Sequence, residues 1–276
     1  MQFSLNHVTF SYKSGSRKIL DDVSLRIKKG EFVFLLGKNG SGKSTFLKHL
    51  NAMLIPTSGE IYVDGKDTKL EKNIYKIRKK VGMILQNPES QIVNSIVEED
   101  VAFGLENIAV DPEIIQKRVD SALKVIGMQT YKKRMINELS GGQRQKIVIA
   151  GVLAMQPDCI LLDEPTSMLD TKSRSEILSI IYDLNKKLGI TIVWITHNLE
   201  EVQCGHRILL MKEGEITLDI TPSELFYNDE TLSKFDLKRT ELVDFVCNLK
   251  KKGLKIKDTT NKEAVIDFIF NQLREN

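Results

Sequence analysis

A buried strand that runs into a glycine-rich loop is the feature that most constrains how this chain folds. Residues Glu31–Leu36 form an apolar run of buried-strand length, and Gly37–Thr45, with the sequence GKNGSGKST, fits the pattern G-x-x-x-x-G-K-[ST]. Phe46–Leu50 then continues with helical spacing. In a strand, loop and helix of this order, backbone N–H groups wrap a phosphate at the positive end of the helix dipole. The sequence therefore predicts a nucleotide-binding loop in an α/β fold.

The loop supplies its own candidate ligands. Lys43 is placed to reach the β- and γ-phosphates, and the hydroxyl of Ser44 is a candidate ligand of Mg²⁺, which prefers oxygen. The alternative is a glycine-rich turn that matches by chance, and the flanking strand and helix argue against it. The residues expected to contact the nucleotide are Gly37, Lys38, Asn39, Gly40, Ser41, Gly42, Lys43, Ser44 and Thr45.

An acidic pair follows a second buried strand. Asp163 and Glu164 come directly after the apolar run Cys159–Leu162. Asp163 is predicted to hold a magnesium-bound water, and Glu164 to orient or deprotonate the attacking water. A strand-end acidic pair is often only the start of a solvated loop, and that alternative would be favoured if the phosphate loop were absent. With the loop present, the pair predicts hydrolysis of the bound nucleotide.

A second glycine-rich helix start lies roughly a hundred residues after the first. The pentapeptide Leu139–Gln143, LSGGQ, offers another cluster of backbone N–H groups to a phosphate. Since one chain cannot easily use both clusters on one nucleotide, the order of the motifs predicts an ATPase that works as a dimer.

Taken with Gln86, Ser167–Asp170 and Thr196-His197, these motifs resemble the nucleotide-binding subunit of an ABC transporter. The resemblance implies an α/β fold: a P-loop NTPase core of ABC ATPase type, with an antiparallel β subdomain, a helical subdomain and a small C-terminal helical extension. It also implies that two subunits meet head to tail. Each ATP would lie between the phosphate loop of one subunit and the LSGGQ segment of the other, and the residues contributed from that side are Ser140, Gly141, Gly142 and Gln143.

The same resemblance assigns roles to single residues. Tyr12 would stack on adenine, Gln86 would join the metal site to a membrane partner, His197 would contact the γ-phosphate, and Asp170 would meet the opposite subunit. The candidate catalytic residues are thus Glu164, His197 and Lys43, and the candidate metal-site residues are Ser44, Gln86 and Asp163. Each of these residues has an ordinary alternative interpretation. For Tyr12, for example, the alternative is that it is simply an aromatic residue at the end of a strand.

The segment Gln86–Asn107 resembles, more narrowly, the A component of energy-coupling factor (ECF) importers, which include cobalt and nickel uptake systems. The resemblance implies that this segment lies near a groove that receives a coupling helix of the transmembrane T component. Ser95 and Glu98 have capping-box spacing and are predicted to open a helix there. The alternative is that the apolar residues of the segment all pack internally.

The chain is predicted to divide into a nucleotide-binding domain, residues 1–225, and a C-terminal helical extension, residues 226–276. The helical subdomain is placed at about residues 87–155. In the extension, a stripe beginning at Leu242 and Phe245 predicts one amphipathic helix, and Thr260 with Glu263 predicts the cap of another. The ECF resemblance implies that the extension joins two ATPase subunits; packing on its own domain is the alternative.

Composition limits the partners. The longest apolar stretch, Ile147–Met155, is far short of the roughly 20 residues that a spanning helix needs, so we expect membrane passage to belong to a partner. Three scattered cysteines and four scattered histidines have no metal-ligand spacing, and the cysteines predict reduced thiols in a cytosolic setting. A net charge of +3 is too small to indicate nucleic-acid binding.

We therefore expect an ATP-hydrolysing, Mg²⁺-dependent subunit that powers an ECF-type importer of vitamins or transition-metal ions through ATP-driven dimer closure. The expected partners are a second ATPase subunit, identical or similar, a transmembrane T component and a substrate-binding S component, at the cytoplasmic face of the cell membrane. A conventional ABC transporter for another solute and a soluble, non-transport ABC ATPase stay open as alternatives.

Overall fold

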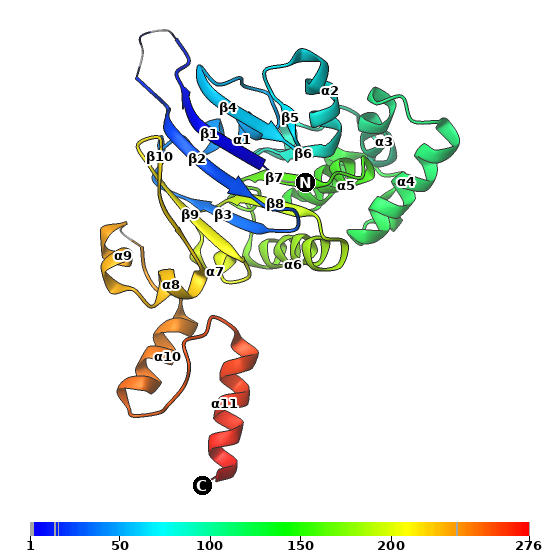
Figure 1. Cartoon of the computed structure of the whole chain (residues 1–276). Coiled ribbons are helices and arrows are strands. Elements are labelled where there is room, and N and C mark those ends of the chain that lie inside the picture. Colours follow the sequence, from blue (N-terminus) through cyan, green and yellow to red (C-terminus); the bar gives the residue numbers. More distant parts are fainter. Residues whose placement is uncertain (1–2, 14, 16, 236, 276) are drawn as a thin grey trace.

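A six-stranded sheet forms the centre of the computed structural model, which describes residues 3–13, 15, 17–235 and 237–275. Its strand order is β10-β9-β3-β8-β7-β6, and all neighbours are parallel except the β9–β10 hairpin (Figure 1). Parallel strands covered on both faces are apolar throughout, which is why each residue of β3 is buried. The strands are β3 (Phe32–Leu36), β6 (Val81–Ile84), β7 (Cys159–Asp163), β8 (Thr191–Ile195), β9 (Arg207–Lys212) and β10 (Glu215–Ile220).

A second, antiparallel sheet has the order β2-β1-β4-β5. In β1 buried side chains alternate with more exposed ones, as expected for a strand with one face on a core. The helix α1 packs between the two sheets through Phe46, Leu47 and Leu50, which are fully buried. The elements are β1 (Phe3–Phe10), β2 (Leu20–Ile27), β4 (Ser58–Val63), β5 (Lys66–Asp67) and α1 (Lys43–Leu50).

The core on the other face of the six-stranded sheet contains the single tryptophan. Trp194 on β8 is fully buried, and its ring lies 5.8 Å from that of Phe34 and 6.2 Å from that of Phe32. The crossover helix α6 (Thr171–Leu188) covers this face with Ile177 and Ile181. The short helix α7 (Leu199–Val202) adds Val202 to this core, whereas α2 (Glu71–Lys80) packs Ile77 into the core on the opposite face.

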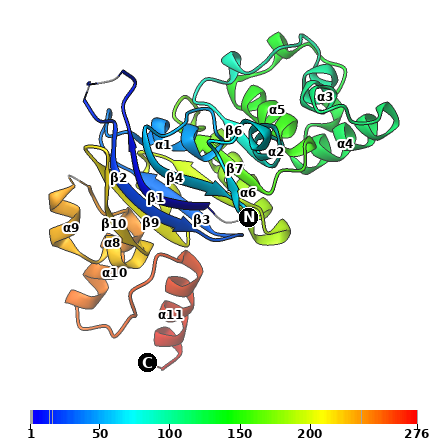
Figure 2. The same ribbon diagram turned by 45° about the horizontal axis from the view of Figure 1, so that its top comes forward.

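A group of helices stands beside the sheets (Figure 2). It consists of α3 (Val97–Asn107), α4 (Pro112–Val125) and α5 (Gly141–Ala154), and 3-10 turns lie at Pro88–Ser90, Gln129–Tyr131 and Ile136–Glu138. The sequence Asp111-Pro112 opens α4: the carboxylate of Asp111 accepts a hydrogen bond from the N–H of Glu113, and Pro112 occupies the first turn. Gly127, with φ of 71°, follows the end of that helix.

The predicted capping box at Ser95 and Glu98 is wrong. The residue before α3 is Ile96, and no side chain caps this helix. Ile96 instead pairs with Met135 in an isolated antiparallel bridge, and the N–H of Glu98 donates to the carbonyl of Lys132. Backbone groups from a distant loop therefore satisfy the helix start, a pairing that the local spacing does not contain.

Four helices follow the sheets: α8 (Pro222–Phe226), α9 (Asp229–Lys234), α10 (Glu241–Lys251) and α11 (Lys262–Glu275). In Figures 1 and 2, α10 and α11 extend away from the sheets, and Val246, Ile256 and Val265 form a small core of their own. A capping box formed by Thr221 and Glu224 opens α8. The cap predicted at Thr260 is wrong.

Asn261, rather than Thr260, caps α11: its side chain accepts a hydrogen bond from the N–H of Glu263, 2.8 Å away. The predicted apolar face of α10 is only partly correct. Phe245 has 46% of its surface exposed, whereas Val243, which the stripe omits, is buried. The predicted α/β class, with its antiparallel sheet, helical group and C-terminal helices, is confirmed.

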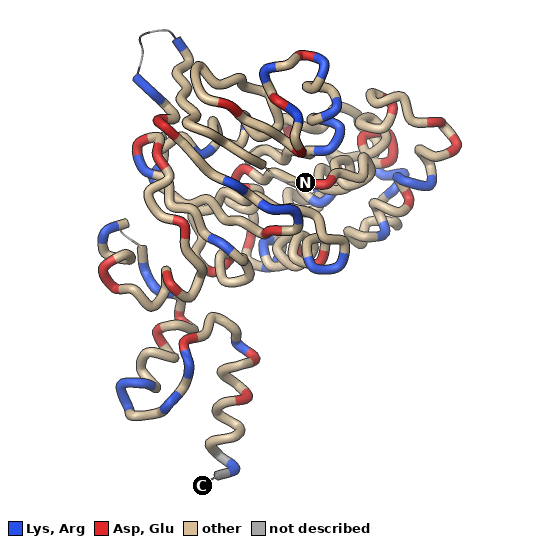
Figure 3. Tube along the Cα trace, in the orientation of Figure 1, with Lys and Arg blue, Asp and Glu red and all other residues tan. Residues whose placement is uncertain are grey.

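Charged residues of both signs are spread over all parts of the chain (Figure 3). Among the described helices, none has both the length and the apolar character needed to cross a bilayer. The free cysteines are Cys159, Cys204 and Cys247, and burial raises the pKa of the Cys204 thiol to about 12.

Candidate functional site

The glycine-rich loop connects β3 to α1 in a conformation that only glycine fits at two positions. Gly37 has φ of 154°, and a Cβ atom there would lie 2.3 Å from the carbonyl oxygen of Met211. Gly42 has φ of 107°, and its Cβ would lie 2.6 Å from the carbonyl oxygen of Ile19. The spacing of glycines in the motif thus lets the loop turn tightly against the β9–β10 hairpin and the start of β2. α1 begins at Lys43, so the loop presents a helix N-terminus with bare backbone around it.

Lys43 is folded back across this loop. Only 6% of the residue is exposed, and its ammonium donates to the carbonyl oxygens of Gly37, at 2.8 Å, and Lys38, at 3.1 Å. Burial lowers the pKa of Lys43, while the carboxylates of Glu164 and Asp163 oppose that shift. The ammonium of Lys43 therefore lies inside the glycine-rich loop, where it could pair with a bound phosphate.

Ser44 and Asp163 bring oxygen ligands together from two elements. The hydroxyl of Ser44 at the start of α1 donates to Oδ1 of Asp163 at the end of β7, 3.1 Å away. Burial raises the pKa of Asp163, and the hydrogen bond from Ser44 opposes the shift. This donor set fits Mg²⁺, which takes one or two protein oxygens and completes its shell with phosphate and water. Within the described ranges, no group of three or more His, Cys, Asp or Glu residues is arranged to hold a metal alone.

Glu164 and His197 meet at the ends of β7 and β8. Glu164 has a left-handed backbone, with φ of 49°, and its N–H donates to the carbonyl of Ile195, 3.1 Å away. Its Oε1 lies 2.9 Å from Nε2 of His197, and the amide nitrogen of Gln86 lies 3.4 Å from Oε2 and 3.3 Å from the hydroxyl of Ser167. The structure therefore brings the predicted carboxylate, imidazole and amide into one cluster at the edge of the sheet.

Tyr12 lies beside the start of α1. Its hydroxyl is 3.1 Å from the hydroxyl of Thr45, and its ring packs edge-on against Phe10 at 5.0 Å. With 58% of its surface exposed, the ring presents a free face at the side of the loop. This placement fits an aromatic platform for a base.

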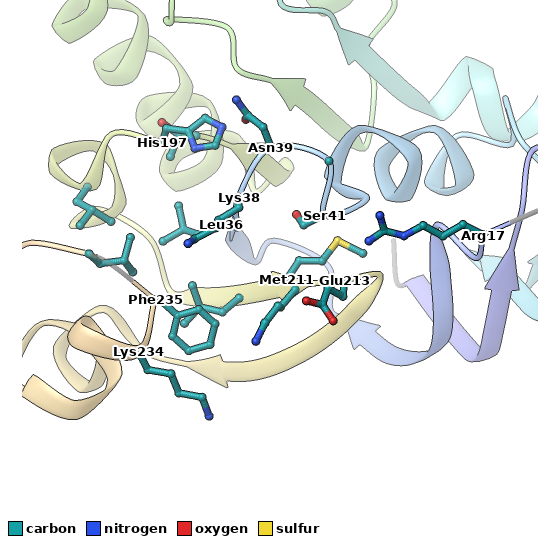
Figure 4. A pocket seen from close by; sticks show the side chains of 17 residues that line it. Arg17, Leu36, Lys38, Asn39, Ser41, His197, Met211, Glu213, Lys234 and Phe235 are labelled. Atoms are coloured by element: carbon teal, nitrogen blue, oxygen red, sulfur yellow. The ribbon is translucent and has the colours of Figure 1, made fainter.

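A cavity of about 640 Å³ borders the phosphate loop on the side of the β9–β10 hairpin (Figure 4). In Figure 4, His197 and Asn39 lie at one end of it and Lys234 and Phe235 at the other. Its lining does not include the two carboxylates or Tyr12. The hydrogen bonds among loop, carboxylates and His197 therefore define the candidate site better than the cavity does.

The LSGGQ segment belongs to a different part of the structure. The hydroxyl of Ser140 accepts from the N–H of Gln143, and Oε1 of Gln143 accepts from the N–H of Ser140, so a reciprocal capping box opens α5. Gly142 packs against Ser173 of α6, whose N–H donates to the carboxylate of Asp170. In the part of the chain that the structure describes, no hydrogen bond or ion pair joins Ser140–Gln143 to the phosphate loop.

The predicted site residues thus fall into two groups. One surrounds the phosphate loop and includes Lys43, Ser44, Asp163, Glu164, His197, Gln86 and Tyr12; the other comprises Ser140, Gly141, Gly142, Gln143 and Asp170. The sequence-based prediction missed Glu201, a buried carboxylate that bridges the loops carrying Glu164 and His197. Its one local signal is its proximity to His197 in the sequence. Its burial gives no signal in advance, because Glu is seldom fully buried.

Comparison with known proteins adds four findings. Residues 20–167 match the ABC transporter family. The energy-coupling factor transporter ATP-binding protein EcfA1 of Caldanaerobacter subterraneus subsp. tengcongensis is 47% identical over 267 residues, which cover 95% of this chain and 96% of that protein. The structure of cbiO1 from Clostridium perfringens, part of the ABC transporter complex cbiONQ, superposes with a TM-score of 0.78 at 35% identity, over 90% of this chain and 98% of that one.

A second solved structure is a dimeric ATP-binding cassette in a post-hydrolysis state with ADP and phosphate bound. It matches with a TM-score of 0.72 and 35% identity, over 80% of this chain and 98% of the other.

Proposed function

This chain belongs to the ABC transporter family and to its energy-coupling factor branch, and we propose that it is the ATP-hydrolysing subunit of an importer of that type. The observation that carries the assignment is the cluster at the edge of the six-stranded sheet, where Lys43, Asp163 and Glu164 surround a helix N-terminus. A loop for the phosphates, an acid for the metal and a second acid for the water are the parts that ATP hydrolysis requires.

In this proposal the residues around the loop divide the chemistry. Lys43 leaves the carbonyls of Gly37 and Lys38 and pairs with the β- and γ-phosphates. Ser44 and Asp163, together with Gln86, which contacts Glu164, would hold Mg²⁺, and the bound ion would neutralise charge on the transferring phosphate. Glu164 takes a proton from the attacking water.

His197 and Gln86 fix the orientation of Glu164. The imidazole Nε2 lies 2.9 Å from one carboxylate oxygen, and the Gln86 amide lies 3.4 Å from the other. His197 lies at the end of β8 with 44% of its side chain exposed, so its ring also has access to a γ-phosphate. Tyr12, with its free ring face, stacks on the adenine.

A second copy, or a similar subunit, completes each site. The LSGGQ segment has a capped helix start and no link to the phosphate loop of its own chain, which supports use of Ser140–Gln143 on the partner's nucleotide. Asp170 caps α6 next to this segment and would lie at the same subunit contact. The dimeric cassette with ADP and phosphate supports the arrangement by similarity.

Substitution of the proposed base tests the assignment. We expect Glu164→Gln to reduce steady-state ATP hydrolysis by about 10²–10⁴-fold, the usual contribution of a general base, while ATP binding is retained. Glu71→Gln, on the first turn of α2, is the matched control and keeps wild-type turnover. Hydrolysis at the wild-type rate in Glu164→Gln would remove that residue from the role, and absence of ATP turnover in the wild-type assembly would overturn the proposed function.

A groove of about 410 Å³ between the sheets and the helical group supports docking of a T component. Met53 and Phe103 are 49% and 37% exposed there, and the bare backbones of Gly104 and Gly151 also line the groove. The groove contacts the catalytic cluster through Gln91. The side-chain oxygen of Gln91 accepts a hydrogen bond from the N–H of Leu85, next to Gln86, and its side-chain nitrogen donates to the carbonyl of Met83. A helix seated in the groove would therefore act on Gln86 through Gln91 and the backbone of Leu85.

Capture from co-expression with the genomic neighbours tests this contact. We expect the tagged chain to retain a small multispanning T component together with an S component, and Phe103→Glu to lose both without loss of ATP binding. Ile114→Glu is the control, because Ile114 is similarly exposed, at 43%, but lies on α4 outside the groove. Retention of a conventional permease pair would assign the chain to an ordinary ABC importer. A complex with the T and S components would place the chain at the cytoplasmic face of the membrane.

The division at residues 225 and 226 is part of the proposal, with residues 226–276 as a C-terminal extension that joins two subunits. Phe245, Ile266 and Phe270 leave 46%, 40% and 59% of their surfaces exposed on α10 and α11. These exposed apolar side chains on short helices support a contact with another subunit. We expect Phe245→Glu and Phe270→Glu to weaken subunit association in sedimentation measurements, and Tyr75→Glu on α2, 55% exposed, to have no effect.

A further inference from the structure

One buried carboxylate joins the two loops that carry the catalytic pair. Glu201 in α7 is only 1% exposed. Its Oε1 accepts a hydrogen bond of 2.6 Å from the hydroxyl of Thr166, and its Oε2 accepts one of 2.5 Å from the hydroxyl of Thr196. Because a buried carboxylate is costly unless its oxygens are paired, a position that needs only packing would favour an apolar side chain.

The two threonines place this carboxylate close to the reaction in sequence and in space. Thr166 is two residues after Glu164, and Thr196 is the residue before His197. The pair Glu164–His197 is itself held at 2.9 Å. Thr196 also accepts a hydrogen bond from the N–H of Asn198, so its hydroxyl fixes the backbone on both sides of His197.

A third segment is connected through Arg174 on α6. Its Nε lies 3.8 Å from Oε1 of Glu201, and its Nη2 donates to the carbonyl of Leu169, 3.3 Å away. Leu169 precedes Asp170, the residue that caps α6 beside the LSGGQ segment. The Glu201 carboxylate is thus linked to the segment after β7, the loop after β8 and the start of α6.

The charges that face Glu201 are few. Arg174 is the neighbouring cation, and Glu200 is the neighbouring anion on its own helix. Burial raises the pKa of Glu201, and the hydrogen bonds from Thr166 and Thr196 oppose the shift. The hydroxyl groups therefore favour the ionised form, and in that form each loop is held by a charge-assisted hydrogen bond.

We propose that Glu201 is a positioning residue that keeps Glu164 and His197 in register and connects both to the subunit-facing start of α6. The inference rests on the proposed ATPase function. Glu201 is buried, and both of its carboxylate oxygens are taken up by the two threonine hydroxyls. It acts through Thr166 and Thr196, so its loss displaces the catalytic groups while the phosphate loop, which binds the nucleotide, stays intact.

Valine substitutions of the threonines provide a sharp test, because valine keeps the volume and removes only the hydroxyl. In the assembled ATPase we expect Thr166→Val and Thr196→Val each to lower kcat by about 10-fold or more, since misplacement of a catalytic group by an ångström costs up to about 10²-fold. The KM for ATP is expected to stay within about threefold of wild type, because the phosphate loop is untouched. Thr166→Ser and Thr196→Ser, which restore the hydroxyl, are expected to recover kcat.

Thr191→Val is the matched control. Thr191 is a fully buried threonine at the start of β8, at the strand end far from His197, and its hydroxyl accepts one hydrogen bond from the N–H of Gly30. We expect it to lower thermal stability as much as Thr196→Val does, with kcat unchanged. Glu201→Gln keeps the shape and weakens both hydrogen bonds, so it should reproduce the loss in kcat.

The outcomes separate the two proposals. If the wild-type assembly does not hydrolyse ATP, the proposed function fails, and this inference fails with it. If the wild type is active but Thr166→Val and Thr196→Val keep its kcat, or lose no more than Thr191→Val at equal loss of stability, the positioning role alone is overturned. The threonine variants decide the matter even where Glu201→Gln fails to fold.

Discussion

The guanidinium of Arg144 and the carboxylate of Glu89 form an ion pair, with Nη1 and Oε1 2.5 Å apart. The pair joins the first turn of α5 to the segment that follows Gln86. Arg144 also donates through Nε to the carbonyl of Leu139 and through Nη2 to that of Asn137, at 3.1 and 3.4 Å. One side chain therefore holds the approach to the LSGGQ segment and links it to the segment that follows Gln86.

We expect the two halves of this ion pair to differ in their effect on stability. Glu89 has 64% of its side chain exposed, so Glu89→Gln should change the free energy of unfolding by less than about 1 kcal/mol. Arg144→Ala also strips two carbonyl groups of their donor and should cost about 1–3 kcal/mol. Urea unfolding of both variants measures the difference, and equal losses would assign the stability to the ion pair itself.

Adjacent glycines of the LSGGQ segment should respond differently to alanine. A Cβ on Gly142 would lie 2.4 Å from the hydroxyl of Ser173, so Gly142→Ala is expected to destabilise the chain by about 1–3 kcal/mol. At Gly141 the nearest atom, in Leu169, is 3.9 Å away. We expect Gly141→Ala to fold with wild-type stability but to lose ATP turnover, because the bare backbone would face the partner's phosphate. Thermal unfolding and ATPase rates together check the pair.

Replacement of Lys43 should act on binding. Its ammonium is held by the loop beside the candidate phosphate position, and a charge-assisted hydrogen bond contributes about 1.5–3 kcal/mol. We expect Lys43→Met to raise the Kd for ATP by about 10–100-fold, measured by calorimetry on the purified chain. The exposed Lys72 on α2 offers the control Lys72→Met, with an unchanged Kd. A weakened Lys72→Met would mean that overall charge, rather than the loop cation, sets the affinity.

His49 predicts a loss of stability in mild acid. Its ring is fully buried, donates through Nδ1 to the carbonyl of Thr45 at 2.8 Å, and packs edge-on against Phe10. Burial lowers the pKa of His49 below its ordinary value of 6.5, so below pH 6.5 the unfolded chain binds a proton that the folded chain does not. The contribution of this group to stability is therefore complete above pH 6.5 and declines as the pH falls.

The change amounts to on the order of 1 kcal/mol per pH unit at most. Urea unfolding at pH 7.5 and 5.5 measures it, with His49→Leu as the variant that no longer titrates. The difference in stability between the two pH values should be smaller in His49→Leu than in the wild type. An identical difference would exclude His49 as a source of the acid sensitivity.

Most of the elements could be predicted from the sequence because their signals are local. Asp111 with Pro112 marks a helix start, and the run that ends at Asp163 has the length and apolarity of a covered strand. Parallel strands bring their carboxyl ends to one edge of the sheet. Residues at those ends, such as Glu164 and His197, could therefore be expected to meet before any distance was known.

Two of the failures share a physical origin, which is dependence on partners distant in the chain. Ser95 has the spacing of a cap, but backbone groups of Lys132 and Met135 occupy the helix start that it would serve. Glu201 has no local pattern, because its burial depends on three segments that meet only in the folded chain. At α11 two neighbouring residues could cap, and the choice of Asn261 over Thr260 depends on the exact register of the helix start.

Trp194, the single tryptophan, is an intrinsic fluorescence probe of one part of the fold. The indole is fully buried between α6 and the six-stranded sheet, whereas α10 and α11 pack around a separate small core that contains no tryptophan. Its fluorescence thus reports the sheet that carries the catalytic groups, while far-ultraviolet circular dichroism reports all helices. Melting of α10 and α11 ahead of the sheet would separate the two signals on heating.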